Sequence, residues 1–299
     1  MPKIVMRDKQ QIHVRVIGKG PPLILLHGFA MESRHWLPFA LPLATRYRVI
    51  VPDLRGFGRS HSVKHNQDCV LSNYAEDLHD LTEALELENI RLAGISMGAL
   101  TALQYFKLYG THRVSRYLHI DQAPKGLNSK DWNWGLFGAK HEQRIQAARR
   151  LIEQLEPYLA RNVAYDDLPR SLKQMLWNEL GLFFSAALSR PGQKKLLRRL
   201  LANESLAKRL FPLTHWGSYI CCLKAYLEQD YDMRDTLKSI EIPVSILVGM
   251  KSEMYPCAGQ LRMADHLPQA SVIPFKASGH APLIDEPIHL LKTFFRWAT

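Results

Sequence analysis

The sequence predicts an α/β fold, with a mostly parallel twisted sheet that is flanked by helices. Short apolar runs of strand length alternate with stretches of helical periodicity, both before residue 124 and after residue 241. Between these two parts the strand-like runs disappear and helical patterns dominate. We therefore expect residues 1–124 and 241–299 to form one α/β core. Residues 125–240 should form a helical cap, or lid, that is inserted over this core.

The first part of the expected core opens with two strands joined by a turn and continues as strands alternating with helices. Apolar side chains alternate along residues 11–17, as in a strand with one buried face. Residues 23–26 are all apolar, as in a parallel strand covered on both faces. Ser72 is a suitable N-cap for an amphipathic helix that ends near Leu87. The expected strands are 3–7, 11–17, 23–26, 47–51, 89–93 and 114–120, and helices should begin near 33, 72 and 99.

The second part of the expected core follows the helical stretch. Residues 244–249 restore the strand pattern, and a helix near 257–266, a strand at 271–275 and a helix from Pro287 should follow. In open parallel sheets, ligands bind outside the carboxyl ends of the strands. A functional site is therefore expected at that edge.

The stretch Gly94-Ile95-Ser96-Met97-Gly98 has the pattern G-x-S-x-G between a strand-like run and a helix-like run. A strand, a tight turn and a helix with serine at the apex form a nucleophile elbow. The glycines allow the close approach of strand and helix, and the helix N-terminus favours developing negative charge. By itself the pattern also fits a glycine-rich turn whose serine has no catalytic role.

Four motifs together resemble those of the α/β-hydrolase superfamily. They are His27-Gly28-Phe29, the stretch 53–60, Gly94–Gly98 and Ser278-Gly279-His280. The resemblance covers nearly all of residues 10–124 and 241–299 and implies the α/β-hydrolase fold of a serine esterase or lipase-like enzyme. It implies no cofactor and no metal, and it assigns the stretch 53–60 a structural role.

The resemblance assigns catalytic roles to the matching residues. Ser96 would be the nucleophile, and His280 the base that accepts its proton, since a serine hydroxyl is a weak nucleophile alone. The backbone N–H groups of Phe29 and Met97 would form the oxyanion hole. Some relatives place the acid after the strand that follows the elbow, which here is Asp121.

The acid of the triad is the point at which this sequence departs from the common pattern. Relatives usually carry aspartate in a G-x-x-D segment, but Ser252 occupies that position here. Asp121 and Glu253 are the two substitutes, and we favour Asp121, with the chain order Ser96, Asp121, His280. Ser252 could then hydrogen-bond the acid.

These residues predict a serine hydrolase that cleaves a small-molecule carboxylic ester through an acyl-enzyme intermediate. Trp132, Trp134 and Trp216 are expected to line a substrate pocket that prefers a lipophilic acyl or aromatic group, although packing between cap helices explains them equally well. Lactone, thioester and C–C bond hydrolysis remain alternatives. A catalytically degenerate ligand-binding relative is another, since Ser252 replaces the usual acid.

The net charge of +11 raises the question of an anionic partner. The excess is concentrated in residues 125–240, with 19 basic and 12 acidic side chains. Residues 194–210 are expected to form one basic amphipathic helix that could contact an anionic membrane surface, but a solvated helix face is the favoured interpretation. No nucleic-acid-binding motif is present, and no such partner is expected.

Cysteine usage and hydropathy indicate a cytoplasmic protein. The four cysteines, Cys69, Cys221, Cys222 and Cys257, form no C-x-x-C pair and are expected to be free thiols. The first residues lack the apolar region of a signal peptide. No apolar run approaches the roughly 20 residues that span a bilayer.

Overall fold

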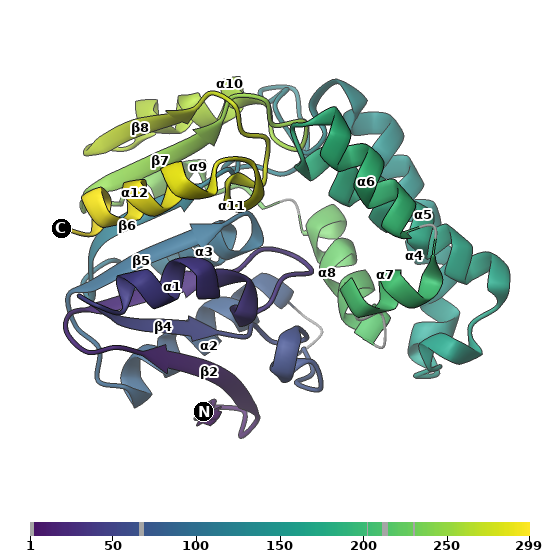
Figure 1. Ribbon diagram of the computed structural model, residues 1–299, viewed down its shortest axis with the longest axis horizontal. Coiled ribbons are helices and arrows are strands. Elements are labelled where there is room, and N and C mark those ends of the chain that lie inside the picture. The colour runs from purple at the N-terminus through teal and green to yellow at the C-terminus, as the bar shows by residue number, and fades with distance from the viewer. Residues whose placement is uncertain (1–2, 66–68, 202, 211–214, 230) are drawn as a thin grey trace.

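The computed structural model describes residues 3–65, 69–201, 203–210, 215–229 and 231–299. The strands form one sheet in the order β1-β2-β4-β3-β5-β6-β7-β8 (Figure 1). The pairs β1–β2 and β2–β4 are antiparallel, and all other pairs are parallel. The strands are β1 (Lys3–Val5), β2 (Gln11–Ile17), β3 (Pro22–Leu26), β4 (Arg48–Pro52), β5 (Ile90–Ile95), β6 (Val114–Ile120), β7 (Val244–Gly249) and β8 (Ala270–Phe275).

Helices cover both faces of this sheet, because the central strands bury side chains on either side. Leu23 and Leu25 of β3 pack against α1 and α12 on one face, whereas Ile24 and Leu26 face the cluster that contains α2 and α3. The prediction of a mostly parallel α/β sheet is therefore confirmed. The helices of the core are α1 (Leu37–Leu43), α2 (Val70–Ala84), α3 (Met97–Tyr109), α10 (Cys257–Leu261), α11 (Pro282–Asp285) and α12 (Pro287–Ala298).

Between β6 and β7 the described chain forms loops, two isolated β-bridges and a series of helices, and it contains no strand. Helices α4 to α8 lie beside the sheet, on the right in Figure 1, and α9 returns to pack against α3. The predicted boundaries at 124 and 241 fall between β6 and β7. The function of this segment as a lid stays a prediction. Its helices are α4 (His141–Ala160), α5 (Arg170–Ala187), α6 (Pro191–Leu201), α7 (Glu204–Leu210), α8 (Trp216–Glu228) and α9 (Arg234–Lys238).

Two predicted helix boundaries differ from the structure. Helix α2 begins two residues before Ser72, and Cys69 is its N-cap, with the Sγ atom accepting a hydrogen bond from the Ser72 N–H at 3.4 Å. The basic stretch 194–210 forms two helices instead of one, and its residue 202 lies outside the described residues. Asn203 Oδ1 accepts a hydrogen bond from the N–H of Leu206 at 3.2 Å, which is the interaction of an N-cap.

The register of the parallel strands aligns their carboxyl ends. Leu26 pairs with Gly94, and Ile95 pairs with Ile120. The residues that directly follow these strands, His27, Ser96 and Asp121, therefore lie at one edge of the sheet. Within the described part of the chain, the helices are too short or too polar to cross a bilayer.

Candidate active site

Ser96 joins β5 to α3 in a backbone conformation that side chains rarely adopt, with φ at 52° and ψ at −120°. A Cβ at Gly94 would lie 2.5 Å from the carbonyl oxygen of Gly98, and a Cβ at Gly98 would lie 2.5 Å from that of Leu26. The two glycines are therefore required by the close approach of strand and helix. They hold a strained turn with Ser96 at its apex, which is the local structure that the motif predicts.

The loop after β3 lies against this turn. A Cβ at Gly28 would lie 3.4 Å from the Ser96 Cβ. His27 accepts a hydrogen bond from the Leu54 N–H at its Nε2 atom, at 2.9 Å. Its Nδ1 therefore carries the proton and donates to the Gly28 carbonyl at 2.8 Å. Burial lowers the pKa of His27, so the neutral ring ties the Gly28-Phe29 loop to the stretch 53–60.

The predicted oxyanion donors follow these two glycine-rich turns. Phe29 comes directly after Gly28, and Met97 is the first residue of α3. No hydrogen bond between described residues uses the backbone N–H of Phe29 or Met97. Both N–H groups thus remain available to an oxygen atom bound beside Ser96.

Asp121 and His280 form the central contact of the site. The Asp121 Oδ2 atom lies 2.7 Å from His280 Nδ1. The carboxylate is fully buried, and it accepts three further hydrogen bonds that compensate for lost hydration. The donors are the Gly249 N–H at 2.8 Å, the Ser252 hydroxyl at 2.7 Å and the Gln260 amide at 2.9 Å.

Ser252 and Glu253 have different surroundings. The predicted hydrogen bond from Ser252 to the acid is confirmed. Glu253 has a side chain that is 51% exposed, and it forms an ion pair with Lys194 of α6. Of the two candidate acids, Asp121 is therefore the one in contact with His280.

His280 lies in the loop after β8, and this loop is held at both sides. The Gly279 N–H donates to Asp285 Oδ2 at 2.7 Å, and the Tyr255 ring lies 5.7 Å from the imidazole. No room exists for a Cβ at Gly249, because the Gly279 carbonyl occupies that space. The loop thus packs on the end of β7 and presents His280 to Asp121.

Ser96 and Asp121 are linked through their strands. The Ser96 N–H donates to the Ile120 carbonyl at 3.0 Å, so the two residues follow neighbouring strand ends. Among the described residues, no hydrogen bond joins the Ser96 hydroxyl to His280. In enzymes without substrate, catalytic hydrogen bonds are often long and tighten only when substrate binds.

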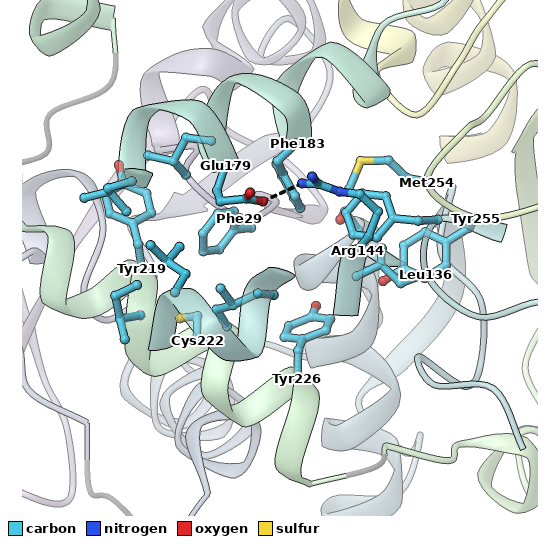
Figure 2. A pocket seen from close by; sticks show the side chains of 18 residues that line it. Phe29, Leu136, Arg144, Glu179, Phe183, Tyr219, Cys222, Tyr226, Met254 and Tyr255 are labelled. Carbon is cyan, nitrogen blue, oxygen red and sulfur yellow. Dashed lines mark ion pairs between the residues drawn. The ribbon is translucent and has the colours of Figure 1, made fainter. Parts of the chain in front are cut away.

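A cavity opens above Ser96 and is lined almost entirely by apolar side chains. Helices α4, α5 and α8 contribute most of its wall, Leu136 contributes from the loop before α4, and Phe29 and Tyr255 contribute from the core side (Figure 2). The Phe29 ring lies 5.2 Å from that of Phe183 of α5. Burial raises the pKa of the cavity tyrosines Tyr219, Tyr226 and Tyr255, so their hydroxyls remain neutral.

The three tryptophans that the sequence assigns to the pocket lie outside this cavity. Trp132 packs with Tyr255 in a small buried cluster, and Trp134 lies under Arg262 at 4.2 Å. Trp216 donates its indole N–H to the Val163 carbonyl at 3.0 Å. This part of the prediction is wrong because composition does not reveal which face of a helix or loop meets the cleft.

Other residues of the site carry no recognisable signal in the sequence. Gln260 is fully buried and donates to Asp121, but a single glutamine in a short helix has no distinctive spacing. Arg144 of α4 and Glu179 of α5 form an ion pair at 2.9 Å in the cavity wall. These two residues are 35 positions apart in the chain, which no local motif connects.

A second histidine–aspartate contact supports the structural role of the stretch 53–60. Asp53 Oδ2 lies 3.0 Å from His13 Nδ1, and Asp53 also accepts hydrogen bonds from the N–H groups of Ser33 and Arg59. Burial alone would raise the pKa of Asp53, but these hydrogen bonds hold it below its usual range. The hydroxyls beside this pair also tie the loops together, because Ser60 Oγ accepts from the His13 N–H and Ser33 Oγ accepts from Arg15.

Comparisons with known proteins agree with this fold. The family model for the alpha/beta hydrolase fold matches residues 21–287. A pimeloyl-[acyl-carrier protein] methyl ester esterase of Nitrosomonas europaea is 26% identical over 288 residues, which is 95% of this chain and 98% of that protein. A solved esterase of Exiguobacterium antarcticum has a TM-score of 0.80 and 23% identity, covering 99% and 98% of the two chains. An enol-lactonase of Burkholderia xenovorans has a TM-score of 0.72 and 17% identity, covering 99% of each chain.

Proposed function

The chain belongs to the alpha/beta hydrolase fold family, and from this premise we propose that it is a serine hydrolase that cleaves a carboxylic ester. The observation that carries the proposal is the 2.7 Å contact between Asp121 and His280, beside the strand end that bears Ser96. A buried carboxylate orients an imidazole, and both belong to the loops that surround a strained serine. This combination serves nucleophilic catalysis.

The proposed reaction proceeds in two halves. The Ser96 oxygen attacks the ester carbonyl while His280 accepts the hydroxyl proton, and Asp121 stabilises the imidazolium that forms. The N–H groups of Phe29 and Met97 would donate to the carbonyl oxygen as it becomes negative. His280 then gives its proton to the departing alcohol. Water, activated by the same histidine, releases the acid from the acyl-enzyme.

The cavity supports a lipophilic acyl or aromatic group on the substrate. Its wall consists mainly of leucine, phenylalanine and tyrosine side chains, such as Leu180, Phe183 and Tyr219. Apolar pockets of this kind bind apolar groups and fix them with few polar contacts. We propose that residues 125–240 act as a lid, because α4, α5 and α8 supply most of this wall.

A lactone is the main alternative substrate, since the same steps open a cyclic ester. The likeness in fold to an enol-lactonase favours including it in any substrate panel. A ligand-binding protein without turnover was suggested by the serine at position 252. The 2.7 Å contact between Asp121 and His280 supports the hydrolase over this alternative.

The proposal is tested with a fluorophosphonate probe and short p-nitrophenyl esters. We expect the probe to label the wild-type protein on Ser96, and we expect hydrolysis to begin with a burst of nitrophenol. Ser96→Ala should lose both signals while keeping the melting temperature. A wild-type protein that neither reacts with the probe nor hydrolyses any ester or lactone would exclude the proposed function.

A further inference from the structure

The cavity wall contains one ion pair in otherwise apolar surroundings. Arg144 of α4 and Glu179 of α5 both line the cavity, with the Arg144 Nη2 and Glu179 Oε2 atoms 2.9 Å apart (Figure 2). Their side chains are 15% and 21% exposed. The Arg144 guanidinium also lies 5.3 Å from the centre of the Phe137 ring.

Packing between the two helices does not explain this pair. Helices α4 and α5 already meet through buried apolar side chains, among them Ile145 and Leu176. Replacing a buried ion pair by apolar residues of similar size is often neutral or stabilising, because the charges lose hydration. The presence of two charges beside leucines and phenylalanines therefore suggests recognition of a polar group in the ligand.

Both charged groups have hydrogen-bonding capacity left over. A guanidinium carries five N–H donors, and a carboxylate has two oxygens that accept. Among the described residues, the contacts of Arg144 are those with Glu179 and Phe137, and Glu179 has no partner besides Arg144. The pair thus offers a donor and an acceptor side by side, with no net charge.

We propose that Arg144 and Glu179 recognise a secondary amide carried by the ester substrate. The amide carbonyl accepts a hydrogen bond from Arg144, and the amide N–H donates to Glu179. A carboxylate drawn to Arg144 would also meet Glu179, and an ammonium group drawn to Glu179 would also meet Arg144, so the pair favours neither ion. An amide is neutral and carries both a donor and an acceptor, as this pair requires. The inference rests on the proposed ester hydrolysis.

The test compares p-nitrophenyl esters of equal chain length. In one series of esters, a single amide replaces two methylene groups of the acyl chain, and its position along the chain differs from one ester to the next. The parent compound is the unsubstituted alkyl ester. We expect one amide position to raise kcat/KM at least about tenfold over the other positions, as expected of two hydrogen bonds to charged groups. In Arg144→Leu/Glu179→Leu this preference should vanish, because the amide ester loses more kcat/KM than the alkyl ester.

A matched control removes another ion pair between helices. Lys224 of α8 pairs with Glu156 of α4 at the surface, where the two side chains are 36% and 52% exposed and neither lines the cavity. Glu156→Gln/Lys224→Met should retain the preference for the amide ester. An Arg144→Leu/Glu179→Leu protein that keeps the preference would show that the pair only ties the helices, and the inference would be wrong.

Binding to the Ser96→Ala protein separates this inference from the proposed function. Calorimetry with the favoured amide ester and its alkyl parent should give a Kd about tenfold lower for the amide. This difference should disappear when Arg144→Leu/Glu179→Leu is added. If the wild type hydrolyses neither ester but the binding difference is preserved, only the proposed esterase function is contradicted. Equal binding of the two esters would contradict the amide site.

Discussion

The sheet core and the segment 125–240 contribute to the site in different ways. In the core, backbone geometry positions each reacting group: two glycines hold Ser96 in its turn, and the Gly249 N–H bonds Asp121. In the segment, one face of each of three helices supplies side chains such as Leu180 and Phe183 to the cavity. Under the proposed function, the core would determine whether a bond is cleaved, and the segment would determine which substrate is accepted.

The largest effect should follow a substitution in the core. Asp121→Asn removes the charge that stabilises the His280 imidazolium and exchanges an acceptor for a donor at a site with four donors. We expect kcat for p-nitrophenyl acetate to fall by about 10³- to 10⁴-fold. Labelling of Ser96 by a fluorophosphonate should slow in parallel.

Circular dichroism of Asp121→Asn must match that of the wild type, because the carboxylate is fully buried. Wild-type turnover in a folded Asp121→Asn protein would contradict the assignment of the acid. It would also remove the contrast between the two regions, since a central group of the core would then be dispensable.

The sequence predicts the core more completely than the segment, because the site in the core depends on local backbone geometry. The signal from Gly94 and Gly98 is local, because the turn itself leaves no space for a Cβ at either position. The motif then places Ser96 between them, and the chain order leads to His280. Asp121 could be proposed because it ends a strand that neighbours the elbow. Its contact with Ser252 is also expected from the sequence, whereas its contact with Gln260 arises from tertiary packing, which the sequence does not reveal.

The cavity shows the limit of sequence-based prediction. Trp132 and Trp216 have the size and apolar character of pocket residues, yet they lie in the packing between elements. The composition of an amphipathic helix does not determine which neighbour its apolar face contacts. Arg144 and Glu179 cannot be recognised as cavity residues from the sequence, because charged residues on two long helices resemble those of a solvent-exposed ion pair.

Buried histidines should make the stability of both regions depend on pH. Burial lowers the pKa of His35, His65 and His119 in the core, and of His215 in the segment, from 6.5 to about 4. Since these pKa values lie below those of the unfolded chain, the unfolded state binds more protons between pH 6.5 and 4. The free energy of unfolding should therefore fall as the pH decreases through this range, by roughly 3 kcal/mol from His119.

Carboxylates of the segment should respond at lower pH. Hydrogen bonds from Ser129 and Arg234 lower the pKa of the exposed Asp131 from 3.8 to about 2. The contribution of Asp131 to stability is present above pH 3.8 and is lost as the pH falls towards 2.

Urea unfolding at pH 7, 5.5 and 4.5 tests the histidines, and His119→Gln is expected to flatten the dependence of the free energy of unfolding on pH. Equal stability at all three values would contradict the prediction.

A substitution in the segment should change selectivity more than turnover. Phe183→Ala removes an aromatic ring that lines the cavity and contacts Phe29 and Phe137. We expect KM for a short acyl ester to rise about tenfold, and the preferred acyl chain to lengthen, because the lost ring leaves space. A chain-length series of p-nitrophenyl esters measures both. An unchanged preference with a lower kcat would place Phe183 with the reacting groups instead.

The smallest effect should come from substituting Glu253, which the sequence offers as the alternative acid of the triad. Glu253 lies next to Ser252 in the chain, but its side chain points to Lys194 of α6 and is 51% exposed. Exposed ion pairs contribute about 0–1 kcal/mol, and Glu253→Gln breaks only this one. We expect kcat within about twofold of the wild type. A loss as large as that of Asp121→Asn would mean that the loop rearranges during catalysis and that Glu253 replaces Asp121. In that case a surface contact between the two regions, and not the buried carboxylate at the end of β6, would control the reaction.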